Sequence, residues 1–145
     1  MKNILLTEVA YRKVESTLDA LVSQITAVRV QLDGSLEIDG VPATIDDNPL
    51  HGAWLSPDIL ENGLIRTFTS QVKSAPTLEW LQTMQAGLNA PFYKQIFDQG
   101  VHLTNSDAQS PAIAEYVVAG VGERIVHLRT PGCAERIRYS RIHML

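Results

Sequence analysis

Cysteine is nearly absent from this sequence, because Cys133 is the only one among 145 residues. A single thiol cannot form an internal disulfide, which excludes the disulfide-stapled scaffolds of secreted proteins. Long apolar runs near the start are missing as well, and Ile4 to Leu6 is too short for a secretory signal or a membrane-spanning helix. We therefore expect a soluble, cytoplasmic protein that does not act at a membrane.

The motifs that hold metals or activate nucleophiles are also lacking. The histidines and the cysteine do not have the paired CxxC or HExxH spacing of a zinc site: His51, His102, His127, His143 and Cys133. No serine stands in the G-x-S-x-G pattern of a hydrolase nucleophile. The sequence thus predicts neither a metal site nor a hydrolytic triad.

Positive charge is scarce in most of the chain. Residues 1–123 carry fifteen acidic and seven basic side chains, whereas residues 124–145 carry five arginines and a single acid, Glu135. The formal net charge is −4. The acidic body argues against a nucleic-acid partner, because phosphate groups are bound by a cationic surface.

The sequence does contain a regular alternation of strand and helix signals. Short apolar runs and turn residues predict strands over 2–7, 28–32, 52–55, 78–84 and 101–104, with a hairpin turn at Asp33-Gly34 and a short returning strand over 35–38. Periodicity and capping signals predict a helix that follows the first strand and has its apolar face over 14–25, and further helices over 57–63, 64–74, 91–99 and 111–121. Residues 40–49 are expected to be irregular, and Ser56 is expected to cap the helix that follows it.

This alternation is typical of an α/β domain whose mainly parallel sheet is covered by helices on both faces. Ligands of such sheets bind beyond the carboxyl ends of the strands, which here fall at residues 7–8, 55–56, 84–89 and 104–107. Glu8 is the one carboxylate directly after the first strand, and we expect it to be solvated.

Two segments carry a family resemblance. LEWLQTMQAGLN (78–89) and GVHLTNSDAQSPAIAEYVVA (100–119) resemble two segments of the D-isomer-specific 2-hydroxyacid dehydrogenases, at the separation expected for that family. KNILLTE (2–8) and GAWLSPDIL (52–60) are similar to the family's first and third strands. The resemblance covers residues 1–121.

The resemblance implies a flavodoxin-like three-layer domain over residues 1–121, with five mainly parallel strands. It places Ala86 and Gly87 where relatives use backbone N–H groups to hold the substrate carboxylate, and a glycine lets the main chain approach an anion closely. Leu55 and Ser56 match the strand end that lines the substrate side chain, and Asn105 matches an asparagine at the start of the crossing between domains. The substrate would be a small 2-keto or 2-hydroxy acid.

The sequence departs from the family at its dinucleotide fingerprint. In GVGERI (120–125), isoleucine stands where the third glycine of G-x-G-x-x-G belongs. NAD or NADP would serve the full-length relative, whereas we expect no cofactor and no catalytic residue in this chain. Residues 122–145 match no family segment; a frameshift, a premature stop or a deliberate truncation with foreign residues would produce such a tail, and an ordinary C-terminal helix is the alternative.

We therefore expect the substrate-binding half of an NAD(P)-dependent D-2-hydroxyacid dehydrogenase, inactive by itself. The predicted helix over 111–121 carries apolar side chains that relatives pack against their second domain, so the chain is expected to form a homo-oligomer through it. The alternative is a stand-alone module that binds a small carboxylate or serves only for dimerisation.

Overall fold

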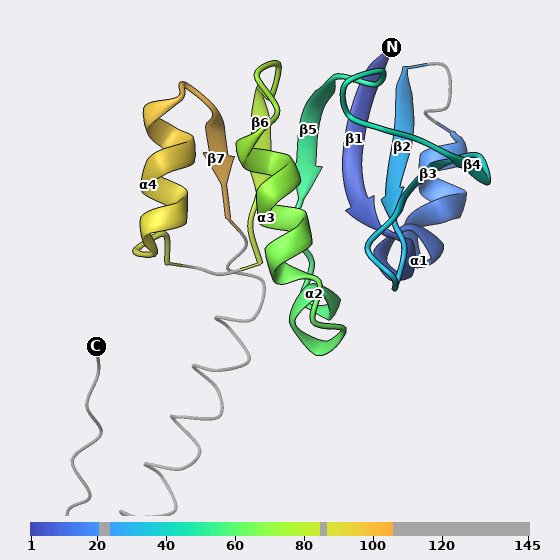
Figure 1. Cartoon of the computed structure of the whole chain (residues 1–145), viewed down its shortest axis with the longest axis horizontal. Helices are drawn as coiled ribbons and strands as arrows, with labels where there is room; N and C mark the ends of the chain where they lie inside the picture. Colours follow the sequence, from blue (N-terminus) through green and yellow to red (C-terminus); the bar gives the residue numbers. More distant parts are fainter. Residues whose placement is uncertain (21–23, 85–86, 106–145) are drawn as a thin grey trace, which may run out of the picture. The chain divides into compact units, whose positions relative to one another are not determined.

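The computed structural model of the chain describes residues 1–20, 24–84 and 87–105. Its strands are β1 (Lys2–Thr7), β2 (Ile25–Val30), β3 (Leu36–Ile38), β4 (Val41–Pro42), β5 (Leu50–Trp54), β6 (Trp80–Gln82) and β7 (His102–Thr104) (Figure 1). Its helices are α1 (Glu8–Asp19), α2 (Asp58–Glu61), α3 (Ile65–Lys73) and α4 (Pro91–Asp98).

The described strands form one sheet in the order β4-β3-β2-β1-β5-β6-β7. The pairs from β2 across to β7 are all parallel, which confirms the predicted α/β class with a mainly parallel sheet. The sheet has seven strands instead of the predicted five, because β3 and β4 extend it with antiparallel pairs. Of these two, β3 matches the short returning strand predicted over 35–38, whereas β4 was not predicted.

The additional strand β4 depends on a tight turn at Asp39 and Gly40. Both residues have positive φ, 51° and 80°, which is the backbone geometry that reverses a two-residue hairpin. Val41–Pro42 therefore pairs with β3, where the polar sequence predicted irregular chain. The predicted hairpin turn at Asp33-Gly34 is confirmed, with the N–H of Gly34 donating to the Gln31 carbonyl at 2.9 Å.

The helices cover both faces of the sheet, with α3 and α4 on one face and α1 on the other (Figure 1). Right-handed crossovers explain this arrangement. The chain steps from β1 to β2 in one direction and from β5 through β6 to β7 in the opposite direction. The helices within these two sets of crossovers therefore fall on opposite faces.

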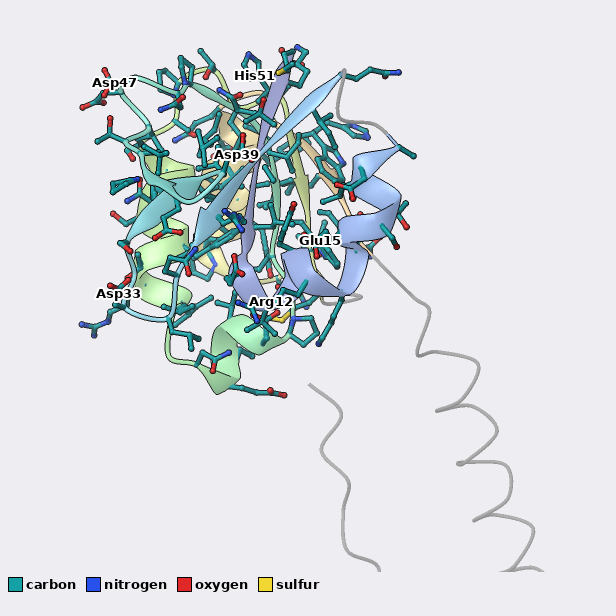
Figure 2. All side chains as sticks on the ribbon, turned by 90° about the vertical axis from the view of Figure 1, so that its right-hand side faces the viewer. Arg12, Glu15, Asp33, Asp39, Asp47 and His51 are labelled. Atoms are coloured by element: carbon teal, nitrogen blue, oxygen red, sulfur yellow. The ribbon has the colours of Figure 1, made fainter. Side chains whose placement is uncertain are left out.

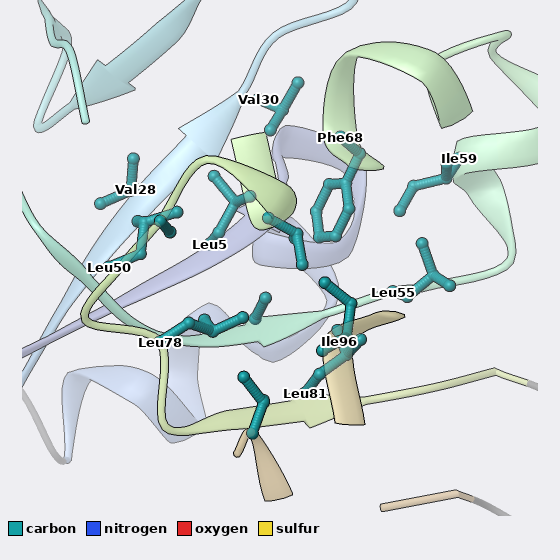
Figure 3. Close-up of a cluster of buried hydrophobic side chains, with 14 of the residues drawn as sticks. Leu5, Val28, Val30, Leu50, Leu55, Ile59, Phe68, Leu78, Leu81 and Ile96 are labelled. Carbon is teal, nitrogen blue, oxygen red and sulfur yellow. The ribbon is translucent and has the colours of Figure 1, made fainter. Parts of the chain in front are cut away.

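The main core lies between the sheet and the layer of α3 and α4 (Figure 3). Alternate strand positions point into it, as expected for the period of two in a strand. Its completely buried members come from four parallel strands and three helices: Leu5, Val28, Leu50, Ala53, Leu81, Ile59, Phe68, Val72 and Ile96. This packing fixes the strands, and with them the loops at their carboxyl ends.

The first helix ends earlier than the apolar spacing predicted, at Asp19. The helix starts at Glu8, directly after the first strand as predicted, and Thr7 caps it, because the Thr7 side chain accepts a hydrogen bond from the N–H of Ala10 at 3.0 Å. Ile25, which continued the helical apolar pattern, is the first residue of β2. The predicted helix over 111–121, the domain boundary at 121 and the tail over 122–145 lie outside the described residues.

Gly52 of β5 lies where the sheet leaves no room for a side chain. A Cβ atom built at Gly52 would lie 2.7 Å from Cδ1 of Ile4 and 2.9 Å from Cε3 of Trp80. These distances are shorter than van der Waals contact between carbon atoms. The side chains of the neighbouring strands β1 and β6 therefore meet across Gly52.

Gly52→Ala is expected to lower the free energy of unfolding by about 1–3 kcal/mol, because the rigid indole ring of Trp80 must shift. Gly87→Ala is a matched control, since a Cβ there meets only Nδ2 of Asn89, at 4.0 Å. Urea unfolding of both variants measures the difference. Equal effects at the two glycines would contradict the steric explanation.

Candidate functional site

The carboxyl ends of the parallel strands lie at one end of the domain. There β1 ends at Thr7, β5 at Trp54, β6 at Gln82 and β7 at Thr104. The order of the sheet changes direction between β1 and β5, whose crossovers leave toward opposite edges. In open α/β sheets, ligands bind at such a switch point.

A buried hydrogen bond crosses this switch point. The Thr7 hydroxyl donates to Oδ2 of Asp58 at 2.6 Å and accepts from the N–H of Ala10 at 3.0 Å. Thr7 is 0% exposed and Asp58 is 5% exposed, so water cannot replace either bond without local opening. The pair thereby fixes the start of α1 to the start of α2, where Asp58 is the first residue.

The two predicted site residues at the end of β5 are both buried. Leu55 belongs to the core, and its N–H donates to the Gln82 carbonyl at 2.9 Å. Ser56 does not cap α2 as predicted, because Pro57 is the residue before the helix and no side chain makes a cap bond. The Ser56 hydroxyl is buried and makes no hydrogen bond with the described protein atoms. This hydroxyl therefore retains unused hydrogen-bonding capacity beside the switch point.

The other predicted site residues belong to the loops after β6 and β7. Gly87 is exposed, and the space around its Cα is open. Asn105 is exposed directly after β7, and Ala86 lies outside the described residues. Because β5, β6 and β7 are parallel neighbours, Leu55, Ser56, Gly87 and Asn105 are brought to the same edge of the sheet.

A chain of side-chain hydrogen bonds stiffens this edge between β6 and β7. Nε1 of Trp80 donates to the Thr104 hydroxyl at 2.8 Å, and that hydroxyl donates to Oε1 of Gln82 at 2.6 Å. Nε2 of Gln82 then donates to the Thr83 carbonyl at 3.0 Å. The loop containing Gly87 thus begins from a strand end whose polar groups are satisfied.

Glu8 is ion-paired and largely shielded, whereas the sequence predicted a solvated carboxylate. Arg12 donates to Oε1 of Glu8 at 2.8 Å, and Arg29 donates to Oε2 at 3.2 Å. Burial raises the pKa of Glu8, but the hydrogen bond from Arg12 and the charge of Arg29 outweigh it and hold the pKa below its ordinary value. The spacing of Glu8 and Arg12, four residues apart in a helix, is the sequence signal that could have revealed the pair.

The first strand-to-helix turn does not fit a dinucleotide. Such sites need glycines that let the main chain approach a pyrophosphate at the helix N-terminus. Here Thr7 already caps the helix with its side chain, and Glu8 adds negative charge in the first turn. Within the described part of the chain, no three histidine, cysteine, aspartate or glutamate side chains gather as metal ligands.

Histidine is missing from this edge among the described residues. His51 and His102 belong to the amino-terminal ends of β5 and β7, and Nδ1 of His51 accepts from the N–H of Asn3 at 3.1 Å. Figure 2 shows His51 at the end of the domain opposite to Arg12 and Asp33. The described residues at the carboxyl edge therefore include no histidine that could transfer a proton.

Thr7→Val is expected to lower the free energy of unfolding by about 2–4 kcal/mol, because it leaves the buried Asp58 carboxylate and the Ala10 N–H without partners. Thr7→Ser keeps the hydroxyl and is expected to retain most of the stability. Guanidinium unfolding distinguishes the two variants. A serine variant as unstable as the valine variant would show that the methyl group, not the hydrogen bond, matters.

The free energy of unfolding is expected to decrease in acid, in part because Glu8 becomes protonated. Because its pKa is lowered in the folded state, Glu8 stabilises the fold above its ordinary value of 4.5, and this contribution is lost as the pH falls through the lowered pKa. Glu8→Gln should therefore lose less stability than the parent chain between about pH 5 and about pH 3, measured by urea unfolding. The control is Glu61→Gln, which removes an exposed carboxylate of α2. If Glu8→Gln loses as much stability between these pH values as the parent chain does, the role of Glu8 is refuted.

No family model, curated protein or solved structure matches the chain. None of the described helices has the length and apolar content needed to cross a membrane. Any proposal of family or function therefore rests on the resemblance of the sequence segments described above, together with the geometry of the carboxyl edge of the sheet.

Proposed function

We propose that the chain is a flavodoxin-like substrate-binding domain of an NAD(P)-dependent D-2-hydroxyacid dehydrogenase. The observation that carries this proposal is the order β2-β1-β5-β6-β7 of the parallel strands. Counted along the chain without the antiparallel extension, it is the order 2-1-3-4-5 typical of flavodoxin-like domains. The loops that resemble the family's substrate-binding loops follow the third and fourth strands of that order.

The proposed ligand is a small 2-keto or 2-hydroxy acid. Its carboxylate would be held by the backbone N–H groups of Ala86 and Gly87, and the exposure of Gly87 supports access to that main chain. The buried hydroxyl of Ser56 has no hydrogen-bond partner among the described residues, and a polar substrate group would reach it only through local opening of this strand end. Leu55 would form the apolar base of the site from within the core, and Asn105 marks the side on which the second domain of a relative would begin.

The described residues would bind and orient the substrate. When bound, NAD or NADP supplies the hydride in this reaction class. Since the first strand-to-helix turn does not fit a dinucleotide, we assign to this domain neither the cofactor nor the proton transfer.

A direct test is an NMR titration of the ¹⁵N-labelled chain with pyruvate, glyoxylate and phenylpyruvate. Saturable shifts are expected for the amides of Gly87, Leu88 and Ser56, and no shifts for Lys2, His51 and Glu79 at the opposite edge. Acetate and isobutyrate serve as carboxylates without a keto group. Equal binding of all five acids would favour the stand-alone carboxylate-binding module, and the absence of saturable shifts would refute the proposed site.

Two substitutions at one position test the role of the main chain. Gly87→Pro removes the N–H group and is expected to weaken keto-acid binding about tenfold or more, as expected for the loss of a hydrogen bond to a charged group. Gly87→Ala keeps the N–H group in an open position and should bind like the parent chain. If both variants bind alike, the carboxylate is held elsewhere.

A further inference from the structure

A second concave surface lies between the first turns of α1 and the hairpin that joins β2 to β3. It is a groove of about 700 Å³, a volume within the range of about 300–1,000 Å³ that is usual for small-molecule sites. Figure 2 shows Arg12 of α1 and Asp33 of the hairpin, which both line it. None of its lining residues belongs to the proposed keto-acid site, so a ligand could bind in this groove whether or not the chain binds a keto acid.

Four residues that line this groove belong to one hydrogen-bonded network: Glu8, Arg12, Gln31 and Glu37. Nε2 of Gln31 donates to Oε2 of Glu37 at 3.1 Å and lies 3.5 Å from Oε2 of Glu8. Glu8 is also bound by Arg12 and Arg29. The ring of Tyr11 lies 4.9 Å from the Arg29 guanidinium carbon and supports it from the side. The groove therefore has charged groups that are already positioned before a ligand arrives.

The two sides of the groove differ in charge: the α1 side carries two cations beside the ion-paired Glu8, and the hairpin side carries two carboxylates. On the α1 side, Lys13 forms no ion pair with a described residue, and Arg12 uses Nε toward Glu8, so its terminal NH₂ groups are available. On the hairpin side, Oε1 of Glu37 makes no hydrogen bond within the described chain, and Asp33 directs Oδ1 to Ser35. Each wall thus retains charge for a partner of the opposite sign.

Apolar side chains also line the groove between these charges. Val9 is half-buried on α1, and Leu32 at the hairpin is 63% exposed. A leucine so exposed at a turn gains from being covered by an apolar group. A purely ionic ligand would leave this surface in water.

We infer that the groove binds a small zwitterion with an apolar body, of the class of free amino acids and short peptides. Arg12 and Lys13 bind its carboxylate. Glu37 and Asp33 bind its ammonium group, and Val9 and Leu32 contact its side chain. A purely anionic ligand would face the two carboxylates of the hairpin wall, and a purely cationic one would face the two cations of α1.

The test is an NMR titration of the ¹⁵N-labelled full chain with leucine and with the dipeptide Leu-Leu. Saturable shifts are expected in the amides of residues 8–13 and 31–37 with at least one of them, and the better ligand distinguishes an amino acid from a peptide. N-acetyl-Leu-Leu lacks the positive charge and Leu-Leu amide lacks the negative charge. Each blocked form is expected to bind more weakly than the free dipeptide, by up to about fivefold, which is the effect of losing one exposed charged contact.

Protein variants test the walls separately. Lys13→Gln should weaken binding of the zwitterion about fivefold, whereas Arg66→Gln, the same charge change on the exposed surface of α3, should not. Glu37→Gln is compared with Glu61→Gln in the same way. The blocked ligands test the acidic wall even if Glu37→Gln disturbs its bond with Gln31. No saturable shift with either zwitterion, or equal affinity for free and blocked forms, would overturn the inference.

Discussion

Leu5, Ala53 and Leu81 lie on adjacent parallel strands and are completely buried beneath α3 and α4. Removing these apolar side chains from water stabilises the sheet and the helices together, with about 1.5–3 kcal/mol for a large side chain such as leucine. Every polar feature described above is placed by this packing. The strands cannot slide without moving leucines out of the core, so their carboxyl ends stay in fixed register.

The polar groups at that fixed edge divide into two kinds. Some hold the framework: Thr7 with Asp58, and Trp80 with Thr104 and Gln82, have their hydrogen bonds satisfied within the protein. Others are not used by the framework: the Ser56 hydroxyl has no hydrogen-bond partner among the described residues, and Gly87 is exposed in an open position. When hydrogen-bonded framework groups are rigid and lie beside groups that the framework does not use, a binding site stays ordered before its ligand arrives.

Local sequence signals were sufficient for most of the elements. Apolar runs located the parallel strands, and Asp33-Gly34 located the hairpin, because each of these signals acts within a few residues. The extent of α1 was missed because Ile25 continues its apolar period by chance, and β4 was missed because a two-residue strand has no pattern of its own. The bond between Thr7 and Asp58 spans 51 positions, and no local rule connects two residues so far apart.

The candidate sites show the same division. The family resemblance selected Leu55, Ser56, Gly87 and Asn105, and the parallel order of β5, β6 and β7 brings their loops to one edge. Sequence alone did not indicate the groove beside α1, because its walls come from a helix and a hairpin whose contact depends on the sheet.

The position of β1 in the centre of the strand order has a consequence for synthesis on the ribosome. Lys2 pairs with Ile25 early, but Ile4 pairs with Gly52, so one edge of β1 has no partner until β5 has emerged, and during that interval a nascent chain exposes a strand edge to which other nascent chains can add.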